Sequence, residues 1–229
     1  MSEKKIIIVL ILISAMFVFL SFSLNVYAIA LSNTQFDRYK ALEYMGEYTI
    51  DPNPAYETLP ADCTNFASQV LYAGGMEEVR VNGGIYDNDY NWYYESNYIP
   101  VLRPRCNTWV GAMSFQRHWA KDKNGFGFER GYNHFTLTVN ECIQYYTDLC
   151  LELAPGDIIQ TIDDDGYPGH TMVVYWITFF GGVEGDFIAD ITYSQHTNNK
   201  YASLIDYLAM KYNNQEGNSK VHFIKVSEN

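Results

Sequence analysis

The chain has 229 residues, of which 48% are hydrophobic and 18% charged, a composition that favours one folded domain of ordinary size over a disordered chain. Its formal net charge is −12, which excludes nucleic acid as an expected partner because phosphate binding needs clustered Lys and Arg. The 20 tyrosines exceed what a core requires. Either some of their rings line a groove for a polar polymer or peptide, or they form the Tyr-rich surface of an exported protein.

The amino-terminal segment has the features of an export signal. A pair of lysines precedes an apolar stretch from Ile6 to Leu24, and small residues suited to signal peptidase follow near Ala28. The stretch is long for a cleaved signal and nearly long enough to span a bilayer, so an uncleaved anchor is the alternative. We therefore predict a signal peptide or membrane anchor over residues 1–30 and a globular domain over residues 31–229 outside the cytoplasm.

Two amphipathic helices are predicted early in this domain. From Thr34 to Glu47 apolar residues recur at every third position, which is typical of a helix with one buried face. A second helix begins after Asp62, a favourable N-cap residue, and ends at Gly74-Gly75. Its phase places Cys63 in the first turn, where backbone N–H groups have no partner within the helix.

The middle of the chain is less regular. From Val81 to Arg105 it is rich in Gly, Asn, Asp and Tyr, which indicates an irregular, aromatic-lined insertion. A third amphipathic helix is predicted from Asn107 to about Lys121. Trp109 on this helix is placed to flank a site, although an aromatic residue at helical spacing more often belongs to a core.

From Leu153 onward the pattern changes to β-rich runs separated by turns. Strands are predicted over residues 157–162, 171–177, 187–193 and 221–226, with a short helix over 202–211. Helices first and strands later predict the α+β class, with N-terminal helices packed on an antiparallel meander.

The four cysteines are Cys63, Cys106, Cys142 and Cys150. An exported chain permits disulfides, and a bridge between Cys142 and Cys150 is our first expectation, although the sequence does not settle the pairing. No paired Cys-x-x-Cys or Cys/His cluster indicates structural zinc, so no metal or other cofactor is expected.

The chemistry is expected at Cys63 and His170. A helix N-terminus favours negative charge, so it lowers the pKa of a thiol placed there. His170 follows Pro168-Gly169 and begins a predicted strand, where its side chain can point into a cleft. An imidazole so placed can take the thiol proton and later return it to a leaving group.

The second ring nitrogen of such a base needs an orienting partner. If the strand from His170 turns near Gly182-Val183 and returns antiparallel, His196 lies opposite His170. An error of two residues in register gives Ser194 or Asn198 instead. Asp190 offers a better acceptor but lies about two pairs further along the returning strand. We therefore expect His196 as the third catalytic residue, with Asp190 as the fallback.

Several runs of this sequence resemble the putative amidase domain of Gram-positive bacteria. They are Arg38-Tyr39, Asn53-Pro54-Ala55-Tyr56, Asp62-Cys63-Thr64-Asn65-Phe66-Ala67-Ser68-Gln69, Ala73-Gly74-Gly75, Trp92-Tyr93-Tyr94, Gly156-Asp157, Gly169-His170 and Tyr193-Ser194-Gln195-His196-Thr197. The resemblance covers essentially the whole exported part. That family is similar to the CHAP and NlpC-type cysteine hydrolases, which implies a papain-like core, with Cys63, His170 and His196 as catalytic residues. It also implies hydrolysis of amide bonds in peptidoglycan.

These observations predict a secreted, monomeric cysteine amidase or peptidase that acts on peptidoglycan or another cell-envelope amide. The residues expected to bind its substrate are Asp62, Asn65, Trp92, Tyr93 and Trp109. Contact with a membrane is expected only through the N-terminal segment, if that segment stays uncleaved. One alternative is a non-catalytic envelope-binding module on the same fold, and another is that Cys63 lies in a disulfide and its motif is structural.

Overall fold

The computed structural model describes residues 36–81, 88–95, 105–181 and 187–228. Its elements are α2 (Arg38–Tyr48), α3 (Cys63–Ala73), α4 (Asn107–Val110), α5 (Ala112–Trp119), β1 (Asn133–Thr138), α6 (Val139–Gln144), α7 (Tyr146–Glu152), β2 (Ile158–Ile162), β3 (Pro168–Gly181), β4 (Phe187–Gln195), β5 (Lys200–Ser203), α8 (Leu204–Asn213) and β6 (Lys220–Lys225). The predicted signal or anchor over residues 1–30 lies outside the described residues. In the ranges that the structure describes, no helix has the length and apolar character that a membrane crossing requires.

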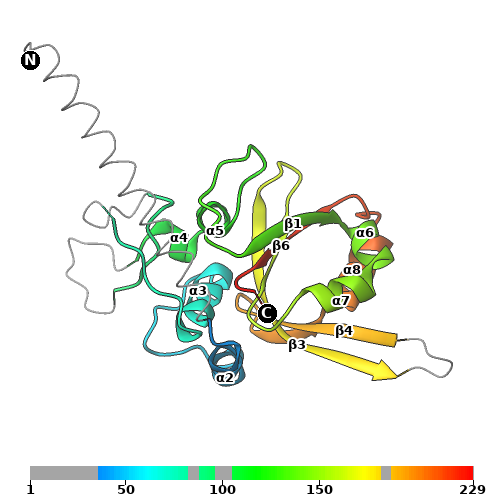
Figure 1. The fold of residues 1–229 in the computed structure, drawn as a ribbon, viewed down its shortest axis with the longest axis horizontal. Coiled ribbons are helices and arrows are strands. Elements are labelled where there is room, and N and C mark those ends of the chain that lie inside the picture. Colours follow the sequence, from blue (N-terminus) through cyan, green and yellow to red (C-terminus); the bar gives the residue numbers. More distant parts are fainter. Residues whose placement is uncertain (1–35, 82–87, 96–104, 182–186, 229) are drawn as a thin grey trace, which may run out of the picture.

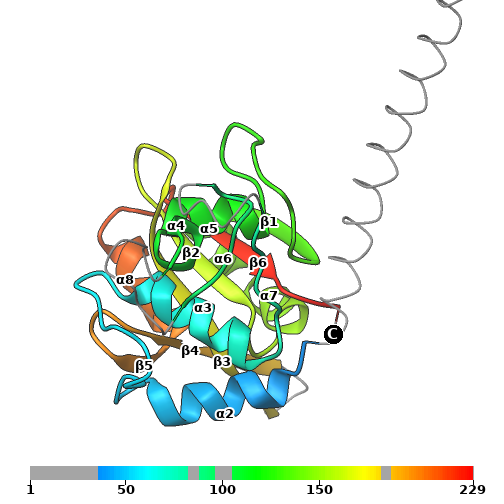
Figure 2. The same cartoon turned by 90° about the vertical axis from the view of Figure 1, so that its left-hand side faces the viewer.

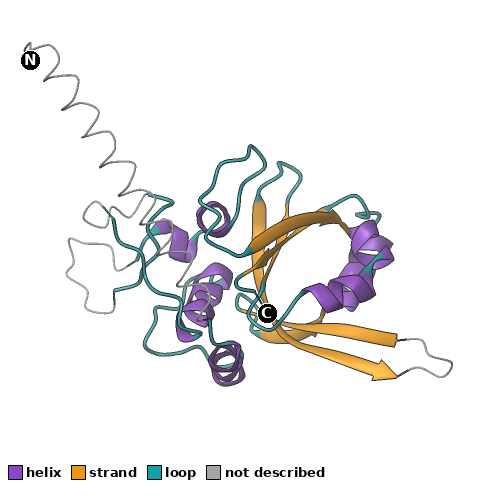
Figure 3. Ribbon diagram, in the orientation of Figure 1, coloured by secondary structure: helices purple, strands orange, loops and turns teal. Residues whose placement is uncertain are grey.

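One antiparallel sheet forms the centre of the fold. Its strand order is β1-β6-β2-β3-β4-β5, and all neighbouring strands are antiparallel. Strands β2, β3 and β4 form the predicted meander, β5 extends it at one edge, and β6 lies between β1 and β2. Helices α2–α5 gather on one side of the sheet and α6–α8 on the other (Figures 1 and 3). The predicted α+β class is therefore confirmed.

Alternate side chains of the central strands fill two separate cores. Ile158 and Val173 belong to the core under α2–α5, whereas their chain neighbours Ile159 and Met172 belong to the core under α6–α8. Successive strand residues face opposite sides of a sheet, so a strand that is covered on both faces is apolar throughout. This explains why the run at the start of β3 does not alternate between apolar and polar residues.

Helix α3 is the most buried helix among the described elements. All residues from Cys63 to Leu71 are buried, and the helix packs against α2 and β3. Figure 2 shows α2 and α3 side by side in front of β3 and β4. The start and end predicted for α3 agree with the structure, and the burial of its first turn fixes the position of Cys63.

A buried ion pair attaches α2 to the sheet. Arg38 donates to the Asp157 carboxylate at 3.1 Å and to the Pro155 carbonyl at 2.6 Å. The same carboxylate accepts the backbone N–H groups of Ala154 and Val226. Burial raises the pKa of Asp157, against the opposing effect of the Arg38 charge. The turn before β2 is therefore held to α2 and to the segment after β6.

Several predicted elements need correction. Helix α2 begins at Arg38, because Asp37 caps it by accepting the N–H groups of Tyr39 and Lys40. The helix predicted from Asn107 to Lys121 is broken at Gly111, whose backbone is extended, into α4 and α5. Strands β1 and β5 and helices α6 and α7 were not predicted, and the helix predicted over 202–211 begins only at Leu204 because β5 occupies Lys200–Ser203.

The predicted Cys142–Cys150 disulfide is absent, and all four cysteines are free and buried. Cys142 lies in α6 and Cys150 in α7, both in the second core. Of the predicted irregular insertion, residues 82–87 and 96–104 lie outside the described residues, as does the turn predicted at Gly182-Val183.

Candidate active site

Cys63 is the first residue of α3, and His170 lies near the start of β3. The structure brings them together as predicted, with the thiol and the imidazole in hydrogen-bond contact. The Thr171 N–H also faces the sulfur, and the Thr64 hydroxyl lies 3.8 Å from it. Cys63 is 8% exposed, and a side chain built on Gly169 would meet nothing within 4 Å. There is therefore open space at Gly169, the residue before His170.

The pKa values of this pair shift toward each other. Burial raises the pKa of the Cys63 thiol, but the hydrogen bond and charge of His170, together with hydrogen bonds from the Thr171 N–H and the Thr64 hydroxyl, outweigh burial, and the pKa falls below its ordinary value. Burial lowers the pKa of His170, but its hydrogen bonds with Cys63 and Gln195 outweigh burial and raise the pKa. Both shifts favour a thiolate beside an imidazolium, which is the reactive form of a cysteine nucleophile.

The residue that contacts the second nitrogen of the base is Gln195, at the end of β4. Its Oε1 lies 2.9 Å from Nε2 of His170, while its Nε2 donates to the Asn198 carbonyl at 3.5 Å. The second contact fixes the amide with its oxygen toward the ring, so Nε2 of His170 donates and Nδ1 remains for the thiol. A side-chain amide oxygen therefore holds the imidazole in the orientation that catalysis requires.

The predicted partner, His196, does not contact His170. Its Nδ1 lies 2.7 Å from the Asp62 carboxylate and its Nε2 lies 2.7 Å from the Tyr48 carbonyl. Both ring nitrogens of His196 therefore face hydrogen-bond acceptors, and neither is directed at His170. The ring also stacks on Phe66 at 4.0 Å between centroids. His196 thus forms a buried hydrogen-bonded pair with Asp62, and the ring joins the end of α2 to the start of α3.

The fallback, Asp190, lies elsewhere on β4. It pairs with Thr178 in the register of β3 and β4, and its carboxylate accepts the Tyr146 hydroxyl at 2.7 Å. It therefore supports the packing of α7 on the sheet and does not orient the base.

Asp62 occupies the N-cap position of α3 but makes no side-chain capping hydrogen bond. Besides His196, its carboxylate accepts the Leu59 N–H at 3.0 Å and the Asn65 amide at 2.7 Å. The predicted cap is therefore absent, and the side chain leaves the N–H groups of the first turn available. Such groups are the donors that stabilise an oxyanion in acyl transfer.

The five predicted substrate-binding residues are all buried: Asp62, Asn65, Trp92, Tyr93 and Trp109. Asn65 accepts the Trp109 indole N–H at 3.0 Å, and the Trp92 and Trp109 rings stack at 4.7 Å between centroids. Asn65, Trp92 and Trp109 therefore contact one another inside the protein, and a role of the five residues in binding substrate stays a prediction. Within the described residues no three His, Cys, Asp or Glu side chains are grouped as metal ligands.

Comparison with known proteins identifies the family. Residues 35–222 match the family described as a putative amidase domain. The chain belongs to this family. Membership suggests that the protein is an amide hydrolase.

One relative is the uncharacterized protein YhbB of Bacillus subtilis (strain 168), which is 27% identical over 144 residues. The match covers 61% of this chain and 37% of that protein, so the chain corresponds to little more than a third of its length. No solved structure matches the chain with significant similarity. The papain-like core and the relation to CHAP and NlpC-type hydrolases remain predictions.

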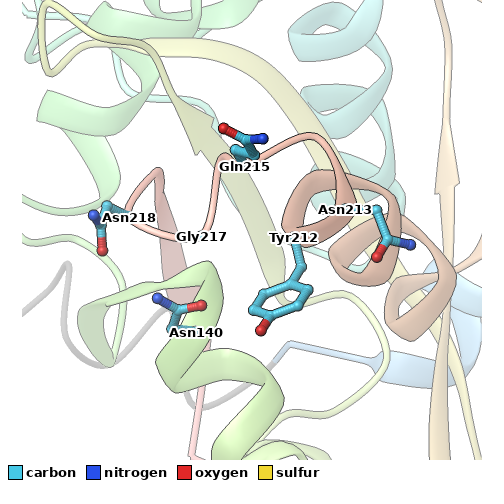
Figure 4. Close-up of a pocket in the computed structure, with 6 residues that line it drawn as sticks. All are labelled: Asn140, Tyr212, Asn213, Gln215, Gly217 and Asn218. Carbon is cyan, nitrogen blue, oxygen red and sulfur yellow. The ribbon is translucent and has the colours of Figure 1, made fainter.

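The amidase-family domain also has a hollow on the side of the sheet away from α3, between α6 and α8 (Figure 4). Its lining consists of Asn140, Tyr212, Asn213, Gln215, Gly217 and Asn218. These residues offer amides and one phenol but no thiol, imidazole or carboxylate. This hollow therefore offers no side chain of the kind that acts as nucleophile or general base in amide hydrolysis.

Proposed function

We propose that the protein is a cysteine-dependent amide hydrolase with Cys63 as nucleophile, His170 as general base and acid, and Gln195 as the residue that orients His170. The observation that carries this proposal is the contact between a thiol with a lowered pKa and an imidazole with a raised pKa. A structural cysteine in apolar surroundings has the opposite shift, and Cys106, Cys142 and Cys150 all show that opposite shift.

The reaction follows from the positions of these groups. The Cys63 thiolate attacks the amide carbon, and N–H groups at the start of α3 stabilise the oxyanion. The tetrahedral intermediate collapses as His170 donates its proton to the leaving amine, which leaves a thioester on Cys63. His170 then takes a proton from water, and the resulting attack releases the carboxylic acid and restores the thiol.

The proposed substrate is an amide of the cell envelope, with peptidoglycan as the first choice. Support comes from the sequence, in which residues 1–30 have the basic, apolar and small-residue pattern of an export signal and precede the amidase-family domain. On this proposal the protein acts outside the cytoplasm, either released or attached through that segment.

The first experiment is alkylation of the purified protein with iodoacetamide at slightly acidic pH, followed by mass-spectrometric mapping of the modified cysteine. Fast modification of Cys63 is expected, and a His170→Ala variant should suppress it because the thiolate loses its imidazolium partner. An inert Cys63 in the native protein would overturn the proposal.

The second experiment is incubation with purified peptidoglycan and analysis of the released fragments. Cys63→Ala should abolish release, whereas Cys142→Ala, a change at a buried cysteine on the other side of the sheet, should retain it. Release that survives Cys63→Ala contradicts the assignment of the nucleophile. Peptidoglycan that is bound but not cleaved by the native protein favours the non-catalytic binding module instead.

A further inference from the structure

Three buried polar side chains form a continuous row that ends at the Cys63 sulfur. Gln160 of β2 lies 3.1 Å from the Thr171 hydroxyl of β3, its cross-strand partner. The Thr171 hydroxyl lies 3.0 Å from the Thr64 hydroxyl of α3, which lies 3.8 Å from the sulfur. Gln160, Thr171 and Thr64 are all 1% exposed or less. Unpaired polar groups are costly at such sites, so this row needs an explanation.

The direction of the row follows from Gln160. Its Nε2 also lies 3.1 Å from the Ala112 carbonyl oxygen, a position that only an N–H donor can occupy. Gln160 therefore donates to both Ala112 and Thr171. The Thr171 hydroxyl can then give its proton to Thr64, and the Thr64 hydroxyl can give its own to the sulfur. A hydroxyl carries one proton, and this arrangement gives each proton of the row an acceptor.

The reverse arrangement suits the site less well. If Thr64 donated to Thr171, the Thr171 proton would have no acceptor that the described residues provide, and an oxygen lone pair would face the sulfur. A thiolate accepts hydrogen bonds and is repelled by a second acceptor. The negative charge of the Cys63 thiolate therefore favours the arrangement in which each hydroxyl donates toward the sulfur.

We propose that Gln160, Thr171 and Thr64 form a donor chain that holds a hydroxyl proton against the Cys63 sulfur and stabilises the thiolate. This inference rests on the proposed function, because it assigns the chain a role in activating the same nucleophile. Thr64 contacts the reacting sulfur, whereas Gln160 and Thr171 are positioning residues that act through it. The ionisable groups that act on the pair are His170 itself, on β3, and Lys200, whose charge acts on His170.

The test is the rate of iodoacetamide modification of Cys63 as a function of pH, with the modified residue identified by mass spectrometry. This rate rises with pH as the thiol loses its proton, and the midpoint is the pH at which half of Cys63 is a thiolate. In Thr64→Val, which keeps the shape of the side chain without the hydroxyl, the midpoint should rise by about one pH unit. At a pH below both midpoints this is about a tenfold loss of rate. Thr64→Ser keeps the hydroxyl and should stay near the native midpoint. Gln160→Met, which removes the terminal donor, should give a smaller rise in the same direction.

Thermal unfolding of each variant separates this role from a structural one, because a loss of packing lowers stability without moving the midpoint. A low native midpoint that is unchanged in Thr64→Val refutes the donor chain and leaves the proposed function standing. An ordinary native midpoint refutes the proposed function itself. Should Thr64→Val fail to fold, Gln160→Met decides, and an unchanged midpoint in that variant refutes the inference.

Discussion

Gln195 provides the sharpest test of the site. Its Oε1 accepts from Nε2 of His170 at 2.9 Å, and the residue is nearly buried. Gln195→Leu removes this acceptor at similar volume, whereas Gln195→Glu keeps the length of the side chain and adds a negative charge. The two variants should change the pKa of His170 in opposite directions.

The magnitude follows from the type of bond. A hydrogen bond to a charged group contributes about 1.5–3 kcal/mol, and about 1.4 kcal/mol corresponds to one pKa unit. The Gln195 bond raises the pKa of His170, so Gln195→Leu should lower that pKa by about one to two units. The thiolate–imidazolium pair then loses its proton at lower pH, and the alkaline limit of activity falls. Gln195→Glu stabilises the imidazolium and should move the same limit upward.

The assay needs no substrate. The imidazole C–H resonances of His170 can be followed by NMR as a function of pH, with assignment by a His170→Gln variant. The pH dependence of iodoacetamide modification gives the pH below which Cys63 is protonated and no longer reacts. This pH should rise in Gln195→Leu, because the imidazolium that stabilises the thiolate is itself less stable. The assignment of Gln195 is refuted if the pKa of His170 in both variants equals that of the native protein. It is also refuted if both variants shift this pKa in the same direction.

Other expectations concern the surrounding structure. His196→Ala should lower the free energy of unfolding in urea by about 3 kcal/mol, because it leaves the Asp62 carboxylate buried without its partner. In a double-mutant cycle, adding Asp62→Ala should recover part of this loss, and strictly additive effects would contradict the pairing. In the folded protein near pH 6, iodoacetamide should modify Cys63 and spare Cys142, because burial raises the pKa of Cys142 to about 12. Equal modification of the two cysteines would contradict this difference. Gly156→Ala should cost at least about 2 kcal/mol in the same urea measurement, since its φ is +93° and an added Cβ would lie 2.7 Å from an aromatic ring; unchanged stability would contradict the geometry of that turn.

The parts of the fold that the sequence predicts well are those where local signals and burial agree. Helix α3 has a polar residue before it, apolar positions along it and Gly74-Gly75 after it, and its predicted limits are those of the structure. The contact of Cys63 with His170 was also predicted, because Cys63 begins a helix and His170 lies near the start of a strand, where side chains can reach a common cleft.

The missed elements have weaker local signals. Helices α6 and α7 are short, and Tyr145 alone separates them, so no apolar period extends over enough turns to be recognised. Helix α6 does carry a capping box, in which Thr138 and Glu141 exchange hydrogen bonds, and this pattern could have marked its start. The break at Gly111 consists of one residue with an extended backbone whose N–H still bonds the Asn107 carbonyl, and a single glycine within an apolar helical period is a weak signal for such a break.

The error at His196 has a specific cause in the hairpin of β3 and β4. A symmetric turn at the predicted position pairs Val173 with Tyr193, whereas the structure pairs Val173 with Ser194. A bulge at Tyr175 supplies the odd shift, because it adds one residue to β3 between two regular stretches. A shift of one residue exchanges the two faces of a strand. Gln195 therefore takes the position beside His170, and His196 turns toward α2 and α3.

The turn after β4 explains why neighbouring residues serve both halves of the site. Thr197 and Asn198 have φ of 61° and 88°, a conformation that costs a β-branched residue such as Thr197 about 1–2 kcal/mol. The cost is offset because the Thr197 hydroxyl accepts the Asp62 N–H at 2.7 Å, one residue before the nucleophile. The tight turn thus joins Thr197 and His196 to the start of α3 while Gln195 joins the base. This short hairpin turn therefore adds a second connection between nucleophile and base, beside the direct packing of α3 on β3.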